Sequence, residues 1–166
     1  IGMFDLSCAS AMIIAAMIGG SLGNTMGIPG LIIGCIAVGV VLGVINGTVY
    51  KLLKIPCLIV SLGLLLIYEI LAQKIGLGVS KTIPADVGII GKFPYSLIIL
   101  GASALLFYYI YNKTCIACHI RAVGNEELLA NALGVNAMNT KYMTFVLAGI
   151  FIGITAILQI SYANSI

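Results

Sequence analysis

Charge is scarce in this sequence of 166 residues, and tryptophan is absent from it. Charged residues make up 8% of the chain, against about 25% in an ordinary soluble domain. The formal net charge of +3 is too small to indicate a nucleic-acid-binding surface. With a single histidine and no paired carboxylates inside its apolar runs, the sequence also gives poor support to a proton relay within a membrane.

A phosphate-binding loop of the G-x-x-x-x-G-K-[ST] type is also missing. Ser80-Lys81-Thr82 lacks the preceding glycine, and Gly91-Lys92 is followed by Phe93. We therefore expect no catalysis on this chain, and any ATP hydrolysis coupled to it must occur on a separate protein.

Long apolar runs dominate what is present, and 61% of residues are hydrophobic. A hydrocarbon core about 30 Å thick needs roughly 17–25 helical residues per crossing. The runs are unbroken rather than alternating, which favours helices. We predict an all-α integral membrane protein, a polytopic helical bundle with about five spans in one domain over residues 1–166. The predicted spans are Leu6–Leu22, Ile28–Val49, Ile55–Ala72, Tyr95–Tyr111 and Met143–Tyr162.

Tyrosines lie near the ends of these runs, where an amphipathic phenol is expected at the headgroup level. The eight tyrosines are Tyr50, Tyr68, Tyr95, Tyr108, Tyr109, Tyr111, Tyr142 and Tyr162.

Four segments connect the predicted spans: a tight polar turn at 23–27, a short basic link at 50–56, a glycine-rich stretch at 73–94 and a long polar stretch at 112–142 that contains its own short helix. If 50–56 and 112–142 share one side, the basic residues favour that side as cytoplasmic and 73–94 as outward-facing. The first side holds Lys51, Lys54, Lys113, Arg121 and Lys141, and the other holds Lys74, Lys81 and Lys92.

Glycines recur at four-residue spacing in the second predicted span. Gly39, Gly43 and Gly47 fall on one helical face, where two backbones can approach closely. Gly149 and Gly153 repeat the spacing in the last span. The face predicts either tight packing within the chain or a contact between subunits.

A short helix is predicted within the polar stretch at 112–142. Asn125 can cap its first amides, and Glu126 and Glu127 lie at the positive end of its dipole. Leu129 stands one turn before Leu133, so the helix has a narrow apolar face. Such a helix can dock onto a soluble partner or lie on the membrane surface. Gly134 suits its left-handed end.

Cys115-Ile-Ala-Cys118-His119 matches the C-x-x-C-H pattern of covalent haem attachment. We interpret the match as incidental, because the pattern is short and no second axial ligand is convincingly placed. A membrane redox or metal-binding subunit that uses Cys115, Cys118 and His119 remains the alternative from another class.

Four stretches resemble the permease subunits of ABC importers of the ribose/galactose type. Gly2-Met3-Phe4-Asp5-Leu6-Ser7 is similar to the family signature that enters a span, and Asn46-Gly47 precedes a similar Lys54-Ile55-Pro56. Ile59-Val60-Ser61-Leu62-Gly63 continues that segment, and Ala122–Asn136 resembles the cytoplasmic coupling loop. Because intact members are longer and the chain opens at Ile1 without a start methionine, we expect it to be a segment of a longer permease. It departs from the family pattern at Cys8-Ala9-Ser10, at Glu69 and in the spacing of Asn125 and Gly134.

The resemblance implies a subunit of the bacterial inner membrane that imports a monosaccharide by alternating access. It implies an ABC ATPase that carries ATP and Mg²⁺, an extracytoplasmic sugar-binding protein and a second permease subunit, identical or different, with no cofactor or metal on this chain. Branched-chain amino acids, nucleosides and autoinducer-2 are alternative substrates. The implied ATPase-coupling residues are Gly124, Asn125, Glu126, Glu127, Leu128, Leu129, Leu133 and Gly134.

Polar residues in or beside the spans are candidates to line a sugar pathway, because a sugar needs hydroxyl and amide groups facing a water-filled cavity. Asp5 can instead cap the first span, and Glu69 can reach the headgroups with Lys74 as a partner. The pathway candidates are Asp5, Ser7, Ser10, Asn46 and Ser61.

Overall fold

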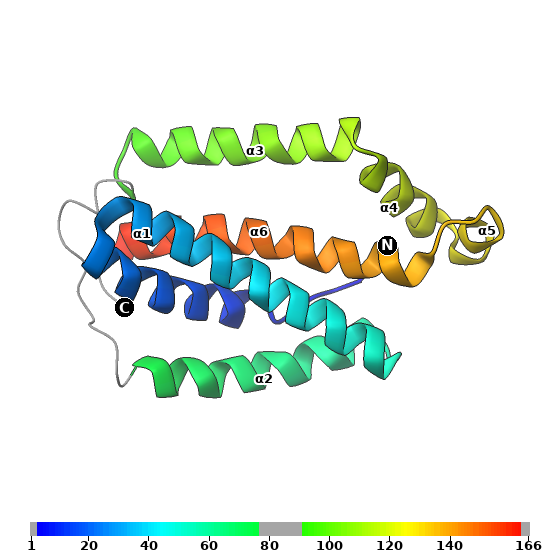
Figure 1. Ribbon diagram of the computed structural model, residues 1–166, viewed down its shortest axis with the longest axis horizontal. Coiled ribbons are helices and arrows are strands. Elements are labelled where there is room, and N and C mark those ends of the chain that lie inside the picture. Colours follow the sequence, from blue (N-terminus) through cyan, green and yellow to red (C-terminus); the bar gives the residue numbers. More distant parts are fainter. Residues whose placement is uncertain (1–2, 77–90, 164–166) are drawn as a thin grey trace.

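The computed structural model describes residues 3–76 and 91–163, and every regular element within these two stretches is a helix (Figure 1). Four helices are long and apolar enough to cross a membrane, which confirms the predicted all-α membrane fold. Much of the glycine-rich stretch predicted at 73–94 lies outside the described residues. The helices are α1 (Cys8–Leu53), α2 (Cys57–Gly76), α3 (Tyr95–Lys113), α4 (Cys115–Asn125), α5 (Glu127–Ala132) and α6 (Ala137–Ala163).

The first helix, α1, is long enough for two crossings and is folded back on itself. Its 46 residues would span about 69 Å if straight, roughly twice the hydrocarbon thickness. The helix breaks at Gly27, whose φ of 69° and ψ of −153° suit glycine and strain other residues. Pro29 follows in the first turn of the returning arm, where its missing N–H costs little. The predicted turn at 23–27 is therefore confined to Gly27.

The two arms of α1, residues 8–26 and 28–53, touch at backbone distance. A Cβ placed on Gly34 would lie 3.0 Å from the Cα atom of Gly19, and one placed on Gly19 would lie 2.8 Å from the backbone nitrogen of Cys35. The arms therefore form a helical hairpin that corresponds to the first two predicted spans. With α2, α3 and α6, the two arms give five segments that can each cross a membrane, because α1, one of the four long apolar helices of the described stretches, supplies two of them.

The glycine face of the second arm packs against α6 within the chain. A Cβ on Gly43 would lie 2.6 Å from the carbonyl oxygen of Phe145 and 3.0 Å from the Cα atom of Gly149. Gly39 faces Gly149 and Gly153 in the same way. Side chains seal the contact further along: Leu31, Cys35, Ala156, Ile157 and Ile160 are buried in one cluster with Ala15 and Ala16 of the first arm.

Helices α2 and α3 lie on opposite sides of this central group (Figure 1). Against the described residues, α3 buries none of its side chains, and most of its apolar surface is exposed. At one end, α4 and α5 continue beyond the tips of the long helices (Figure 1). The short helix predicted within 112–142 is present as α5, but the prediction missed α4 in the same stretch and placed the start of α6 at Met143 rather than at Ala137.

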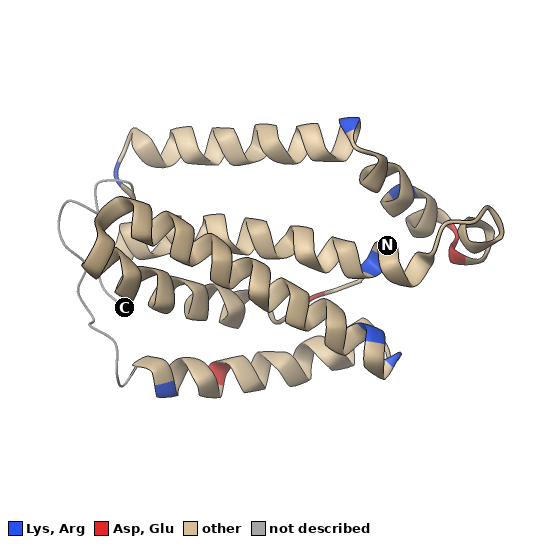
Figure 2. Ribbon diagram, viewed as in Figure 1, with Lys and Arg blue, Asp and Glu red and all other residues tan. Residues whose placement is uncertain are grey.

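Charged residues gather at the two ends of the bundle (Figure 2). The end of α1 and the α4–α5 segment lie at one end of the bundle, as expected for 50–56 and 112–142, whereas α2 ends and α3 begins at the other (Figure 1). Lys74 lies in the last turn of α2, and Lys92 shortly precedes α3. Glu69 is exposed on α2, and among the described residues no ion pair joins it to Lys74, its possible partner.

Two of the tyrosines that were expected at the headgroup level are buried against protein. Tyr50 and Tyr68 are 8% and 3% exposed. The Tyr50 ring packs against Phe145 at 5.6 Å between centroids, and the Tyr68 hydroxyl donates a hydrogen bond inside the bundle. Position near the end of an apolar run did not distinguish them from exposed tyrosines such as Tyr108 and Tyr109.

Candidate functional site

The end of the bundle that carries α4 and α5 contains the predicted coupling residues. Asn125 does not cap the short helix, because it is the last residue of α4. Glu126, with φ −154° and ψ 113°, occupies the extended position between the helices, and Glu127 opens α5. Gly134 has a φ of +86°, which confirms the left-handed end predicted for the helix.

The apolar side chains of this segment point in two directions. Leu128, Leu129 and Leu133 are 80%, 56% and 74% exposed. Ala130 is buried, and it packs with Val123 of α4 and Ala137 of α6. The small residues thus hold α5 against the bundle, while the leucines are presented outward.

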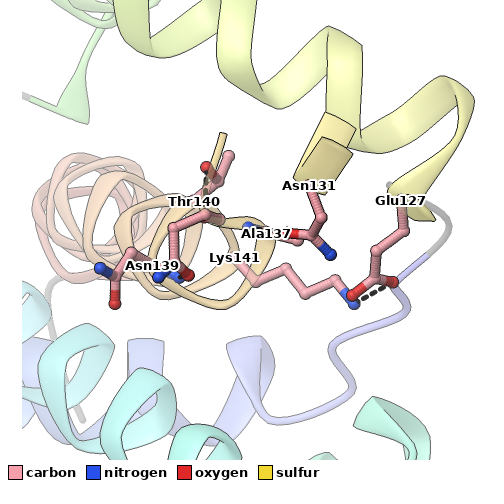
Figure 3. A network of polar contacts seen from close by, with 7 residues as sticks. Glu127, Asn131, Ala137, Asn139, Thr140 and Lys141 are labelled. Atoms are coloured by element: carbon pink, nitrogen blue, oxygen red, sulfur yellow. Dashed lines mark hydrogen bonds and ion pairs between the residues drawn. The ribbon is translucent and has the colours of Figure 1, made fainter. Parts of the chain in front are cut away.

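Polar contacts fasten α5 to the start of α6 (Figure 3). Lys141 Nζ donates to Glu127 Oε2 at 2.6 Å, the only ion pair among the described residues. Asn131 Oδ1 accepts the backbone N–H of Ala137 at 3.1 Å, so it satisfies a free amide at the start of α6. These contacts join α5 to α6, which in turn packs along the second arm of α1.

Two hollows flank the turn that follows α5. One, of about 450 Å³, is lined by Glu127, Asn131 and residues 134–138. The other, of about 330 Å³, lies between the turn and α4 and includes Ile116, His119 and Met143 in its lining. The exposed leucines and the two hollows can together form a contact surface for another protein. The leucines provide an apolar ridge, and the hollows can accept side chains of the partner.

Three of the predicted pathway residues meet in a buried polar cluster within the bundle. The Ser7 hydroxyl donates to Asp5 Oδ1 at 2.6 Å, and Asn46 Nδ2 donates to Ser7 Oγ at 2.7 Å. Asn46 Nδ2 also lies 3.4 Å from Asp5 Oδ2, and Tyr68 donates to Asn46 Oδ1 at 2.6 Å. The cluster therefore joins the N-terminal segment, the second arm of α1 and α2.

The other two pathway candidates lie close to this cluster. The Ser61 hydroxyl lies 3.0 Å from the Leu58 carbonyl oxygen and 3.4 Å from that of Phe4. Ser10 is buried in the first arm of α1. Ser61 thus bonds to carbonyl groups of the protein itself, and the role of both serines in a pathway stays a prediction.

Sequence reasoning missed Tyr68, Asn131 and Lys141 as members of these sites. Tyr68 was placed in the headgroup belt, and its contact with Asn46 joins two different helices. Lys141 pairs with Glu127, which lies 14 residues earlier on another helix. Sequence rules for side-chain pairs cover residues three or four apart on one helix, so they could not predict this pair. A local signal existed only for Asn131, since Asn is a common partner of free amides where helices begin.

Cys115, Cys118 and His119 are all exposed on α4. Over residues 3–76 and 91–163, no three His, Cys, Asp or Glu side chains are grouped so that they could hold a metal ion. The motif thus stands as three separate surface side chains on one short helix.

Comparison with known proteins identifies the family of the chain. Residues 1–166 match the family model described as branched-chain amino acid transport system / permease component. The chain belongs to this family. It is thus a multi-pass membrane permease component of ABC transport, a transport subunit rather than an enzyme. No curated protein and no solved structure gives a significant match.

Proposed function

We propose that this permease component forms the translocation pathway of an ABC importer for a monosaccharide of the ribose/galactose/xylose class. In this proposal it dimerises with an identical or different permease subunit in the bacterial inner membrane and alternates its access. An ATPase that binds ATP and Mg²⁺ supplies the energy, and an extracytoplasmic binding protein delivers the sugar.

The observation that carries the proposal is the geometry of α5. A six-residue helix presents Leu128 and Leu129 outward, beyond the ends of the long helices, and is held from behind by Ala130. Exposed apolar groups of this size at the tip of a loop mark an interaction site. The Lys141–Glu127 pair fastens the helix to α6. A force applied at α5 by a closing pair of ATPases therefore reaches the bundle.

Leu129→Asp tests the coupling role. Its carboxylate would be buried in an apolar docking groove without a partner, which costs several kcal/mol. In water the same substitution on an exposed helix costs within about 0.5 kcal/mol of stability. We expect normal membrane insertion, loss of co-purification with the ATPase and collapse of uptake.

Leu129→Met and Leu52→Asp are the matched controls. The first keeps an apolar side chain at the same place and should retain uptake. The second adds the same charge at a leucine that is 74% exposed at the same end of the bundle, outside the α4–α5 segment. If Leu129→Asp transports as well as both controls, α5 is not the coupling helix.

Branched-chain amino acid transport is the second candidate, because the matching family is described by that substrate. The sugar is supported by the resemblance of the Asp5-Leu6-Ser7 and Asn46-Gly47 segments to the ribose/galactose type. Proteoliposomes with the cognate ATPase and binding protein separate the two. We expect ATP-dependent uptake of a labelled monosaccharide that excess leucine does not reduce, whereas uptake of leucine alone would make the second candidate correct.

The redox alternative has its own test. Cys115→Ser combined with Cys118→Ser removes both thiols of the C-x-x-C-H motif, and both are exposed, so folding should be unaffected. We expect uptake to remain intact. Loss of function together with a haemochrome spectrum in the wild-type protein would favour the redox subunit instead.

A further inference from the structure

An apolar crevice of about 250 Å³ lies between α3 and α6, against α4. Of its lining side chains, Tyr111 and Thr144 alone carry polar atoms, and the Thr144 hydroxyl already donates to the Thr140 carbonyl at 2.9 Å. A space with so few polar partners is poorly suited to ordered water. The lining is Phe107, Ile110, Tyr111, Ala117, Ile120, Thr144, Leu147, Ala148 and Phe151.

Three aromatic rings form the wall of the crevice. Phe107 meets Phe151 edge to face at 5.5 Å between centroids, and it stacks on Tyr111 at 5.8 Å. The aromatic wall therefore extends from Phe151 on α6 to Tyr111 near the end of α3. Since α3 buries none of its side chains against the described residues, hydrocarbon of the bilayer can reach this wall.

The mouth of the crevice is basic. The Arg121 guanidinium lies 4.9 Å from the centroid of the Tyr111 ring and donates to the Tyr111 carbonyl at 2.7 Å. A guanidinium has five N–H donors, so others remain for a ligand. Lys113 ends α3 and is exposed. Helices α3, α4 and α6, which line the crevice, contain no Asp or Glu, so the charge that they carry is positive.

We propose that this crevice is a binding site for an anionic phospholipid, with an acyl chain against the aromatic wall and the phosphate held by Arg121 beside Lys113. Basic residues between membrane helices at the headgroup level recognise anionic lipid headgroups. A guanidinium matches the geometry of a phosphate. The site is separate from the proposed sugar pathway and from α5, and it does not depend on the transported substrate.

The absence of tryptophan from the chain gives a clean optical test. Phe151→Trp places one fluorophore in the crevice, and Leu105→Trp places one on the exposed side of α3 as the control, at a leucine that is 71% exposed. Each full chain is reconstituted into phosphatidylcholine nanodiscs that contain brominated phosphatidylglycerol or, at the same fraction, brominated phosphatidylcholine. We expect the anionic lipid to quench position 151 about fivefold more effectively than the zwitterionic one. The control should show equal quenching.

Charge-removal variants then locate the headgroup. In the Phe151→Trp background, Arg121→Gln should bring the preference for the anionic lipid close to one, while Lys92→Gln at the opposite end should leave it unchanged. Lys113→Gln should lower the preference without touching the bond between Arg121 and Tyr111. Equal quenching by both lipids at position 151, or a preference that survives both Arg121→Gln and Lys113→Gln, would overturn the proposal. Absence of quenching at 151 by either lipid would mean that the crevice is closed or filled by protein, and would overturn it as well.

Discussion

At the scale of single residues, the side-chain amide of Asn46 uses both of its ends inside the bundle. Its nitrogen donates to Ser7 and lies near Asp5, while its oxygen accepts the Tyr68 hydroxyl. Asn46 is 2% exposed, so each of these groups would be costly to leave without a partner. The cluster therefore holds the N-terminal segment against two helices. Its polar groups form most of their hydrogen bonds with one another.

Tyr68→Phe tests this cluster. The change removes the hydroxyl and leaves Asn46 Oδ1 buried without that donor, which should cost about 1–3 kcal/mol of stability. The measurement is the thermal unfolding midpoint of the purified protein in detergent. Tyr109→Phe is the control, since Tyr109 is 67% exposed and its loss should change the midpoint little. Equal midpoints for the two variants would contradict the role of the cluster.

Gly43→Ala tests the backbone contact between the second arm of α1 and α6. The added methyl would lie 2.6 Å from the Phe145 carbonyl oxygen, which belongs to backbone and cannot rotate away. Overpacking of this kind costs about 1–3 kcal/mol. At Gly63, no described atom lies within 4 Å of the added carbon, so Gly63→Ala should be neutral or slightly stabilising. Folded yield and unfolding midpoint should separate the two variants, and if they behave alike the close contact is absent.

These residues show what sequence could and could not supply. Four-residue spacing placed Gly39, Gly43 and Gly47 on one face, but it could not say whether that face meets α6 or another subunit. The polar cluster depends on Asn46 approaching Ser7 and Tyr68, and that approach follows from the topology of the bundle rather than from any local pattern. Polar residues near a span thus look the same in sequence whether they face a pathway or bond to one another.

At the scale of helices, apolar length was a strong signal and helix ends were a weak one. The second arm of α1, with α2 and α3, follows the predicted spans closely because a bilayer demands an uninterrupted apolar stretch. The stretch before α6 was read poorly, because α4 is polar on one side and begins only two residues after Lys113. Asn125 looked like a cap by residue type, yet the chain places it at the end of α4.

The attachment of α5 to α6 makes a prediction at the same scale. Lys141→Glu places a like charge opposite Glu127 and should release α5, and it should also lower overall stability because the Lys141 side chain is only 12% exposed. Amide hydrogen exchange over residues 126–136 should accelerate, and co-purification with the ATPase should fall. Combining Lys141→Glu with Glu127→Lys restores an opposite pair and should recover both readouts. Failure of the double variant to recover either would show that the pair does not position α5.

At the scale of the whole molecule, five successive crossings would place the connecting segments alternately on the two sides of the membrane. Helices α1 and α3 end at the side of the bundle that carries α4 and α5, whereas α2 ends and α3 begins at the other (Figure 1). Lys51, Lys54 and Lys113 lie at the ends of α1 and α3, Lys74 lies in the last turn of α2, and Lys92 shortly precedes α3. Basic residues flanking membrane helices are retained on the cytoplasmic side, and acidic residues such as Glu126 contribute little to this rule. The charge distribution therefore favours a cytoplasmic position for α5, which stays a prediction.

Cysteine labelling across α3 tests that orientation. The 19 residues of α3 span about 28 Å, close to the hydrocarbon thickness, so Lys92 and Lys113 should lie on opposite faces of the membrane. Lys92→Cys and Lys113→Cys are made in a background whose five native cysteines are replaced, and intact cells are treated with an impermeant maleimide. We expect labelling at position 92 in intact cells and at position 113 only after permeabilisation, with Leu129→Cys behaving like position 113. Labelling of both lysine positions from outside would mean that α3 does not cross the membrane, and reversed labelling would place α5 out of reach of a cytoplasmic ATPase.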